Sequence, residues 1–159
     1  MTARNVHSRK SFVRIREQTT LTLGHRIGSE VGTMIYSKQS SRSPGEVGKR
    51  LEEAAARNKF GVLHIHDLKK TLESKGIQLG SECLVYDVCN PDAATRALHT
   101  DLRVSTVLPC RISIFSKDGG CLISTVKPTS LFAATGLKGS EALAAEVEQK
   151  VLKIIDESA

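Results

Sequence analysis

Two short motifs place a cysteine at the edge of a regular element, and they are the best candidates for chemistry in this chain. Cys89 ends the apolar segment 83–88 and is followed by Asn90 and Pro91, which open a predicted helix. A thiol at a helix N-terminus lies at the positive end of the helix dipole, which lowers its pKa and favours the thiolate. We therefore predict a thiol or ligand site at Cys89, Asn90 and Pro91, where the helix amides could hold an anion.

Cys110 follows Leu108 and Pro109 and opens the next predicted strand. In the functional interpretation it is a neighbouring or resolving thiol for Cys89. In the alternative, both cysteines are structural, because free cysteine is often buried and behaves as a small hydrophobic residue. The two interpretations stay open here, since a disulfide needs Cα atoms within about 7 Å and the pattern does not specify that spacing. We predict structural roles for Cys83 and Cys121.

His64 and His66 are two residues apart on a predicted strand, so their side chains point the same way. Two imidazoles with a carboxylate or with Cys89 could hold a metal ion. No third ligand has a matching spacing, so we predict solvent-facing histidines and no metal site. The sequence also lacks phosphate-loop, dinucleotide, Cys-x-x-Cys, zincin and serine-hydrolase motifs, so the cofactor and the reaction stay unassigned.

Composition describes an ordinary globular chain. It has 159 residues, 40% of them hydrophobic and 25% charged, which fits one domain with a real core. With four Phe, two Tyr and no Trp, the core must be aliphatic, and a base-stacking surface for nucleic acid is disfavoured. Apolar runs stay well short of the roughly 20 residues of a membrane span. Four irregularly spaced cysteines favour free thiols in a reducing compartment, so we expect the cytoplasm.

Residues 1–33 differ from the rest of the chain. They hold six of the basic residues against two acidic ones, so most of the net charge of +6 lies there. Three interpretations compete: a disordered basic arm, an organellar transit peptide, or upstream sequence translated from an early start codon. We favour the third, because Met34 begins the first segment with clear strand character. RNA binding through this segment is the weakest functional hypothesis.

Local signals from residue 34 onward predict one α+β domain over 34–159. Ser43, Pro44 and Glu46 form a helix start with a capping box, and Asp118-Gly119 is typical of a type I′ hairpin. The expected strands are 34–36, 60–65, 83–88, 110–115 and 121–126, and the expected helices follow Ser43, Asp67, Asn90, Lys127 and Ser140. We predict a curved, antiparallel-rich sheet with helices on one face and a long C-terminal helix. In the hairpin, Ile114 should pair with Ile123, and Ile112 with Thr125.

Several of these motifs together resemble domain-of-unknown-function family 302 (DUF302). They are Phe60-Gly61-Val62, Ile65-His66-Asp67-Leu68, Cys89-Asn90-Pro91 with Ala97-Leu98, and Leu108-Pro109-Cys110-Arg111-Ile112. The resemblance covers roughly residues 33–130. It implies a TATA-binding-protein-like α+β fold and a homodimer, and it implies no activity.

The sequence thus leads to two hypotheses from different classes. In the first, a homodimeric domain binds a small molecule, an anion or a sulfur or redox species at a pocket formed by Cys89, Asn90, Pro91 and Cys110. In the second, the protein is a non-catalytic dimeric interaction module with structural cysteines, and its outer sheet face contacts a protein partner.

Overall fold

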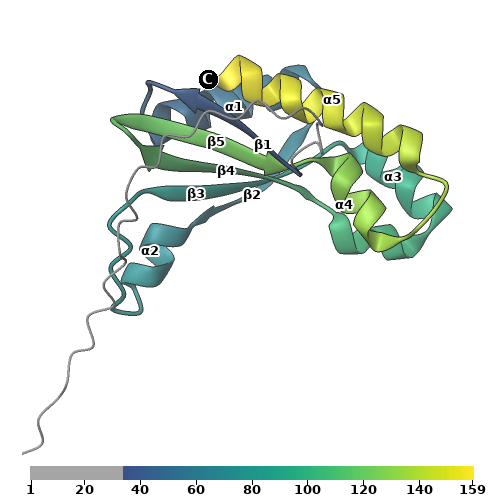
Figure 1. Cartoon of the computed structure of the whole chain (residues 1–159), viewed down its shortest axis with the longest axis horizontal. Coiled ribbons are helices and arrows are strands. Elements are labelled where there is room, and N and C mark those ends of the chain that lie inside the picture. Colours follow the sequence, from purple (N-terminus) through teal and green to yellow (C-terminus); the bar gives the residue numbers. More distant parts are fainter. Residues whose placement is uncertain (1–33) are drawn as a thin grey trace, which may run out of the picture. The chain divides into compact units, whose positions relative to one another are not determined.

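Five antiparallel strands form one sheet with the order β1-β5-β4-β3-β2 in the computed structural model, which describes residues 34–159 (Figure 1). The strands are β1 (Ile35–Ser40), β2 (Gly61–Asp67), β3 (Cys83–Cys89), β4 (Cys110–Lys117) and β5 (Gly120–Val126). All four neighbouring pairs are antiparallel. The predicted α+β class is therefore confirmed, while the expectations for residues 1–33 lie outside the described residues.

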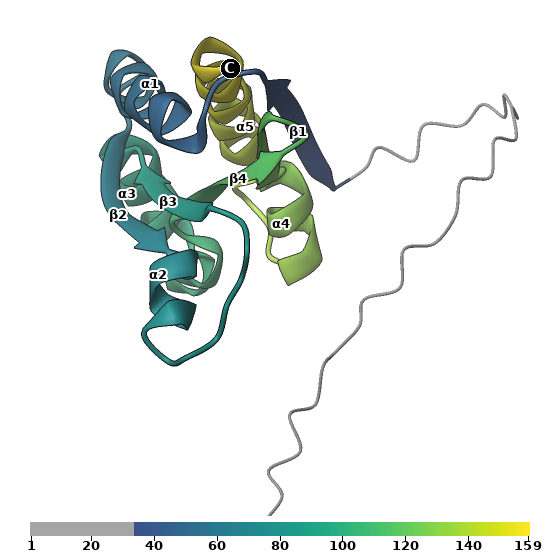
Figure 2. The same ribbon diagram turned by 90° about the vertical axis from the view of Figure 1, so that its left-hand side faces the viewer.

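Helices cover one face of the sheet and extend beyond one of its ends. They are α1 (Pro44–Arg57), α2 (Leu68–Glu73), α3 (Pro91–Thr100), the 3-10 helix η1 (Leu102–Val107), α4 (Pro128–Thr135) and α5 (Glu141–Ser158). Figure 2 shows α1 and α5 side by side on the covered face. In Figure 1, α3 and α4 lie beyond the end of the sheet, so the helices of residues 34–159 leave the opposite face open between α2 and α4.

The start of α1 shows how local sequence builds these elements. Ser43 Oγ accepts a hydrogen bond from the Glu46 amide at 3.3 Å, and the Glu46 carboxylate accepts one from the Ser43 amide at 3.0 Å. Pro44 occupies the first helical turn, where its missing N–H has no cost. The predicted capping box is confirmed.

The β4–β5 hairpin sets which side chains face the helices. Asp118 and Gly119 both have positive φ, at 49° and 79°, as a type I′ turn requires. The turn produces the predicted register, with Ile114 opposite Ile123 and Ile112 opposite Thr125. Because side chains alternate along a strand, β4 directs its even-numbered residues from Cys110 to Ile114 toward the helices and its odd-numbered ones toward the open face.

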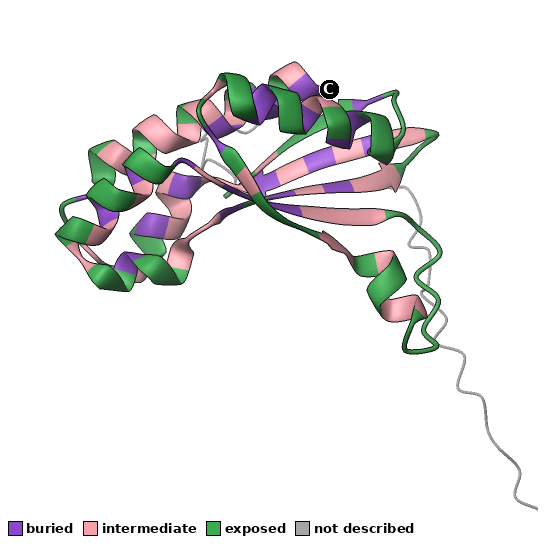
Figure 3. Ribbon diagram, turned by 180° about the vertical axis from the view of Figure 1, so that it is seen from behind, coloured by how far each residue is buried: buried purple, intermediate pink, exposed green. Residues whose placement is uncertain are grey.

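The main core lies between the sheet and the helices α1 and α5. Apart from Cys121, its fully buried side chains are aliphatic, as the composition predicts: Val47, Leu51, Ala54, Ala55, Val88, Ile112, Ile114, Ile123, Val151, Ile154 and Ile155. Figure 3 shows buried residues on the strands and on the helices that cover them. Full burial of one such side chain contributes about 1.5–3 kcal/mol. A second cluster of buried residues, Ala97, Val104 and Phe132, joins α3, η1 and α4.

The end of β1 differs from the sequence prediction, which places a loop at residues 38–42. β1 continues to Ser40, through the segment expected to be a loop, because it pairs with β5 as far as Cys121. On α3 the buried residues are Ala93 and Ala97, whereas Leu98 is only partly buried. Within residues 34–159, the helices are all too short or too polar to cross a membrane.

Candidate functional site

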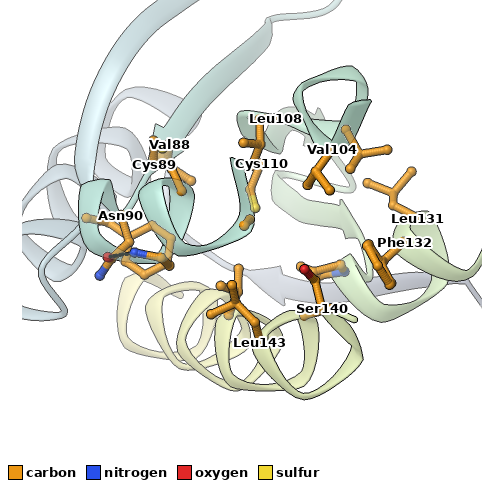
Figure 4. A pocket seen from close by; sticks show the side chains of 18 residues that line it. Val88, Cys89, Asn90, Val104, Leu108, Cys110, Leu131, Phe132, Ser140 and Leu143 are labelled. Atoms are coloured by element: carbon orange, nitrogen blue, oxygen red, sulfur yellow. Dashed lines mark hydrogen bonds between the residues drawn. The ribbon is translucent and has the colours of Figure 1, made fainter. Parts of the chain in front are cut away.

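A cavity of about 60 Å³ lies where the end of the sheet meets α3, α4 and α5 (Figure 4). Most of its walls are apolar side chains: Phe60, Val88, Ala93, Ala94, Ala97, Val104, Val107, Leu108, Pro128, Leu131, Phe132, Leu143, Ala144 and Val147. The remaining lining residues are Cys89, Asn90, Cys110 and Ser140. The structure therefore brings together three of the four predicted site residues, and Pro91 is not among the residues that line the cavity.

Asn90 acts as the N-cap of α3, as predicted. Its Oδ1 accepts a hydrogen bond from the Ala93 amide at 2.9 Å, and only 6% of the residue is exposed. Pro91, the next residue, has no N–H to offer. From the sequence, the helix amides are expected to be available for an anion. The Ala93 amide, however, already donates its hydrogen bond to the Asn90 side chain.

Burial raises the pKa of the Cys89 thiol above its ordinary value. Burial, with a smaller contribution from the charge of Cys89, also raises the pKa of Cys110, to about 11. Apolar walls disfavour the charged thiolate, and this raises the pKa of a buried thiol. The expectation of a lowered pKa at Cys89 is wrong, because the sequence did not reveal that residues of α4 and α5 close over this end of the sheet.

The two thiols are near neighbours in the sheet. Val88 is the cross-strand partner of Cys110, so Cys89 is one residue beyond that pair, and both cysteines line the cavity. All four cysteines are free thiols. Cys121 is fully buried in the main core, as its predicted structural role requires, and Cys83 is partly exposed at the far end of β3.

Ser140 is the residue that sequence reasoning misread. It precedes α5 as a normal N-cap would, yet its side chain makes no capping hydrogen bond. Its Oγ is buried without a hydrogen-bond partner among the described residues, and it borders the cavity together with Cys110 and Leu143 (Figure 4). A buried hydroxyl with no partner costs about 1–3 kcal/mol. No local sequence signal distinguishes such a serine from an ordinary cap.

The raised pKa of Cys110 predicts a loss of stability at alkaline pH. The unfolded chain ionises near the ordinary thiol pKa of 9.0, while the folded protein keeps Cys110 neutral up to about 11. The neutral Cys110 thiol therefore stabilises the folded state by about 2–3 kcal/mol below about pH 9, and this stabilisation is lost as the pH rises toward 11. Urea unfolding across this range should show a smaller decline for Cys110→Ala than for the wild type. A Cys83→Ala control should keep the wild-type decline, and an equal decline in all three proteins would contradict the assignment.

The histidines lie on the open face of the sheet, away from the cavity. Their rings are 4.3 Å apart, and His66 Nε2 lies 2.8 Å from Asp87 Oδ2. A register shift in β2 between Val62 and His64 precedes them. In the described part of the chain, no group of three or more metal-ligating side chains forms.

The comparisons with known proteins concern family and fold. The model of the family described as "Domain of unknown function DUF302" matches residues 36–158. A similar solved structure is that of an uncharacterized conserved protein DUF302 from Bacillus stearothermophilus, with 28% sequence identity and a TM-score of 0.77 over 80% of this chain and 100% of that chain. Among the curated proteins, none matches this chain. The similarity thus extends over nearly all of the described residues and brings no activity with it.

Proposed function

Because the chain belongs to the family described as domain of unknown function DUF302, whose description names no activity, we propose a function from the cavity alone: binding of a small, uncharged, largely apolar molecule with one hydrogen-bonding group. The observation that carries this proposal is the unpartnered hydroxyl of Ser140. A ligand that hydrogen-bonds to Ser140 Oγ removes the penalty of leaving that group unsatisfied. Binding energy then comes from the apolar walls, and selectivity comes from the hydroxyl.

The walls favour a neutral ligand over an anion. Moving an ion into an apolar cavity is strongly unfavourable unless a partner charge awaits it, and among residues 34–159 no charged side chain lines this cavity. Both thiols are held neutral, so Cys89 and Cys110 act in this proposal as soft, polarizable contacts for the ligand, including a neutral sulfur compound, and not as nucleophiles. A single water needs roughly 10–15 Å³ of such space, so a cavity of about 60 Å³ accepts a molecule of several heavy atoms.

Ethanol and propane, which are nearly equal in size and small enough for a cavity of about 60 Å³, form a matched pair of probes for this function. In the wild type, both should shift the NMR signals of residues around the cavity. In Ser140→Ala, the preference for ethanol over propane should fall roughly three- to tenfold, because one neutral hydrogen bond is lost. Ala144→Leu should fill the cavity and weaken both ligands. Probes that leave the cavity signals unchanged in the wild type would refute the function, and an unchanged preference in Ser140→Ala would refute the role of the hydroxyl.

The same serine supports a prediction about stability without ligand. Ser140→Ala should leave the free energy of unfolding unchanged or raise it by about 1 kcal/mol, because it removes an unsatisfied group and no capping bond. The control is Ser43→Ala, which breaks a complete capping box and should lower stability by about 1 kcal/mol. Urea unfolding at neutral pH measures both. Equal losses in the two variants would mean that Ser140 Oγ is bonded in solution.

A second candidate function is a homodimeric protein-interaction module. Exposed apolar side chains along the edge strand β2 and after α2 favour it: Leu63 is 63% exposed, Ile77 54% and Leu79 41%. An edge strand with apolar side chains invites pairing with another chain. Sedimentation velocity should give a dimer that Leu63→Glu dissociates, whereas Lys38→Glu on β1 at the opposite edge should leave it intact. A wild-type monomer at micromolar concentration would remove this candidate.

The cytoplasmic location and the TATA-binding-protein-like label stay predictions. Neither the location nor the fold label decides between the two candidate functions.

A further inference from the structure

The open face of the sheet carries a buried carboxylate between two potential cations. Asp87 Oδ2 lies 2.8 Å from His66 Nε2, and Asp87 Oδ1 accepts a hydrogen bond from Arg111 Nε at 3.2 Å. The Asp87 side chain is 12% exposed and that of Arg111 70% exposed. Burial opposes ionisation of Asp87, but the hydrogen bonds and charges of His66 and Arg111 outweigh it and hold the pKa of this carboxyl below its ordinary value.

This arrangement fixes Arg111 without using all of its hydrogen-bonding capacity. Asp87 and Arg111 are cross-strand partners on β3 and β4, so the carboxylate holds the guanidinium through Nε. Within residues 34–159, neither terminal nitrogen of Arg111 donates a hydrogen bond. A guanidinium held at one side presents its remaining N–H groups as a preorganised fork, which matches the paired oxygens of a carboxylate or phosphate.

Arg111 also borders a groove of about 580 Å³ on this face. Ser113 and Ser124, cross-strand partners on β4 and β5, supply hydroxyls next to the arginine. The remaining lining includes apolar side chains: Val85, Val107, Leu108, Pro109, Val126 and Leu131. The volume lies in the range of small-molecule sites, and the mixture of one cation, hydroxyls and apolar walls suits a ligand with a charged end and an apolar body.

We propose that this groove binds a small amphiphilic oxyanion, a carboxylate or phosphate attached to an apolar body, with Arg111 as the anchor of the anionic group. The groove and the cavity of Ser140 share Val107, Leu108 and Leu131 in their walls, but their polar anchors, Arg111 and Ser140, differ. Arg111 alternates with Cys110 and Ile112 along β4 and therefore lies on the opposite face of the sheet.

Charge favours a small oxyanion in the groove over two other occupants, residues 1–33 of this chain and a second copy of the protein. Residues 1–33 of the chain carry six basic and two acidic residues, and this net positive charge does not complement the guanidinium of Arg111. A second copy related by a two-fold axis through Arg111 would bring the two arginines together, because residues on the axis of such an interface contact their own copies. A small oxyanion satisfies the arginine fork without either conflict.

Octanoate, octyl phosphate and octan-1-ol are suitable probes, titrated below their micellar concentrations into the full chain by calorimetry. Octanoate or octyl phosphate should bind, and the stronger of the two identifies the headgroup. Octan-1-ol should bind at least tenfold more weakly, because it cannot accept a charge-assisted pair from Arg111. Inorganic phosphate alone should also be weak, because it lacks the apolar body. Equal binding of octan-1-ol and octanoate by the Ala144→Leu variant, in which the cavity of Ser140 is filled, would overturn the proposal.

Arg111→Gln should weaken binding of the preferred anion at least tenfold, and Arg111→Lys less, since lysine keeps the charge without the fork. The matched control is Arg57→Gln, an exposed arginine paired with Glu157 on the helical side, which should stay within twofold of the wild type. If Arg111→Gln fails to fold, Ser113→Leu keeps the Arg111–Asp87 pair, fills the groove and should weaken binding similarly. Normal binding by a folded Arg111→Gln or Ser113→Leu variant would refute the site. A second outcome would also refute the site: the wild type binds none of the anions, and Arg111→Gln changes the sedimentation coefficient. The groove would then be a contact between two copies of the protein.

Discussion

Replacement of Ile112 by alanine is expected to lower the free energy of unfolding by about 2–5 kcal/mol, the range for isoleucine truncation in a well-packed core. Ile112 is fully buried on β4, the central strand of the sheet, with Tyr86 on β3 and Thr125 on β5 as its cross-strand partners. Its side chain faces the helical layer, where truncation leaves a cavity that surrounding strands and helices cannot easily close. The loss therefore includes both the transfer free energy and the cavity cost.

Ser113→Ala is the control for this measurement, because residue 113 is next along β4 and faces the groove. Its expected effect lies within about 0.5 kcal/mol, as for surface substitutions without a special role. Urea unfolding of the two variants therefore compares the two faces of one strand. A loss at Ser113 as large as that at Ile112 would contradict a core confined to the helical side of the sheet.

Gly120→Ala is expected to lower the free energy of unfolding by about 1–3 kcal/mol through overpacking. A Cβ at Gly120 would lie 2.2 Å from the carbonyl oxygen of Ser40 and 2.9 Å from Cα of Ser41. Both obstacles are backbone atoms at the end of β1, so a change of side-chain rotamer cannot relieve them. β1 must move away from β5, and the pairing of Ser40 with Cys121 should weaken first.

Gly45→Ala provides the matched control for a glycine without a close neighbour. No atom lies within 4 Å of a Cβ built at Gly45, in the first turn of α1. This change should raise stability by up to about 1 kcal/mol, because alanine favours the helix and restricts the unfolded chain. Hydrogen exchange at β1 amides, measured with urea unfolding, should show faster exchange in Gly120→Ala alone. Unchanged β1 exchange in that variant would contradict the steric explanation.

The two proposed binding sites make opposite demands on charge, which keeps their tests separate. The cavity of Ser140 lies among apolar side chains and neutral thiols, so its ligand should be insensitive to salt. The groove offers a partly exposed guanidinium, so its ligand should bind more weakly as ionic strength rises. The variants Ser140→Ala and Arg111→Gln each change a residue that lines one site only, so the two tests can fail separately although the sites share Val107, Leu108 and Leu131.

The sequence alone predicts most of the secondary structure, because its signals act over a few residues. The capping box at Ser43, the Asn90 cap and the Asp118-Gly119 turn each depend on neighbours within about four positions, and all three occur as predicted. The hairpin turn also fixes the register between β4 and β5. The resemblance of the motifs around Cys89 and Cys110 to DUF302 identified the family correctly.

Only the tertiary structure decides the chemical character of the sites, because each depends on groups far apart in the chain. Cys89 and Cys110 share one cavity, but side chains of α4 and α5 make it apolar and reverse the expected direction of the thiol pKa. Ser140 becomes an unpartnered hydroxyl only where that cavity closes. The pairing of Asp87 with Arg111 spans 24 residues and follows from strand register, which local pattern does not encode across β3 and β4. Burial and cross-strand neighbours are products of packing, and a local sequence pattern specifies only the elements that pack.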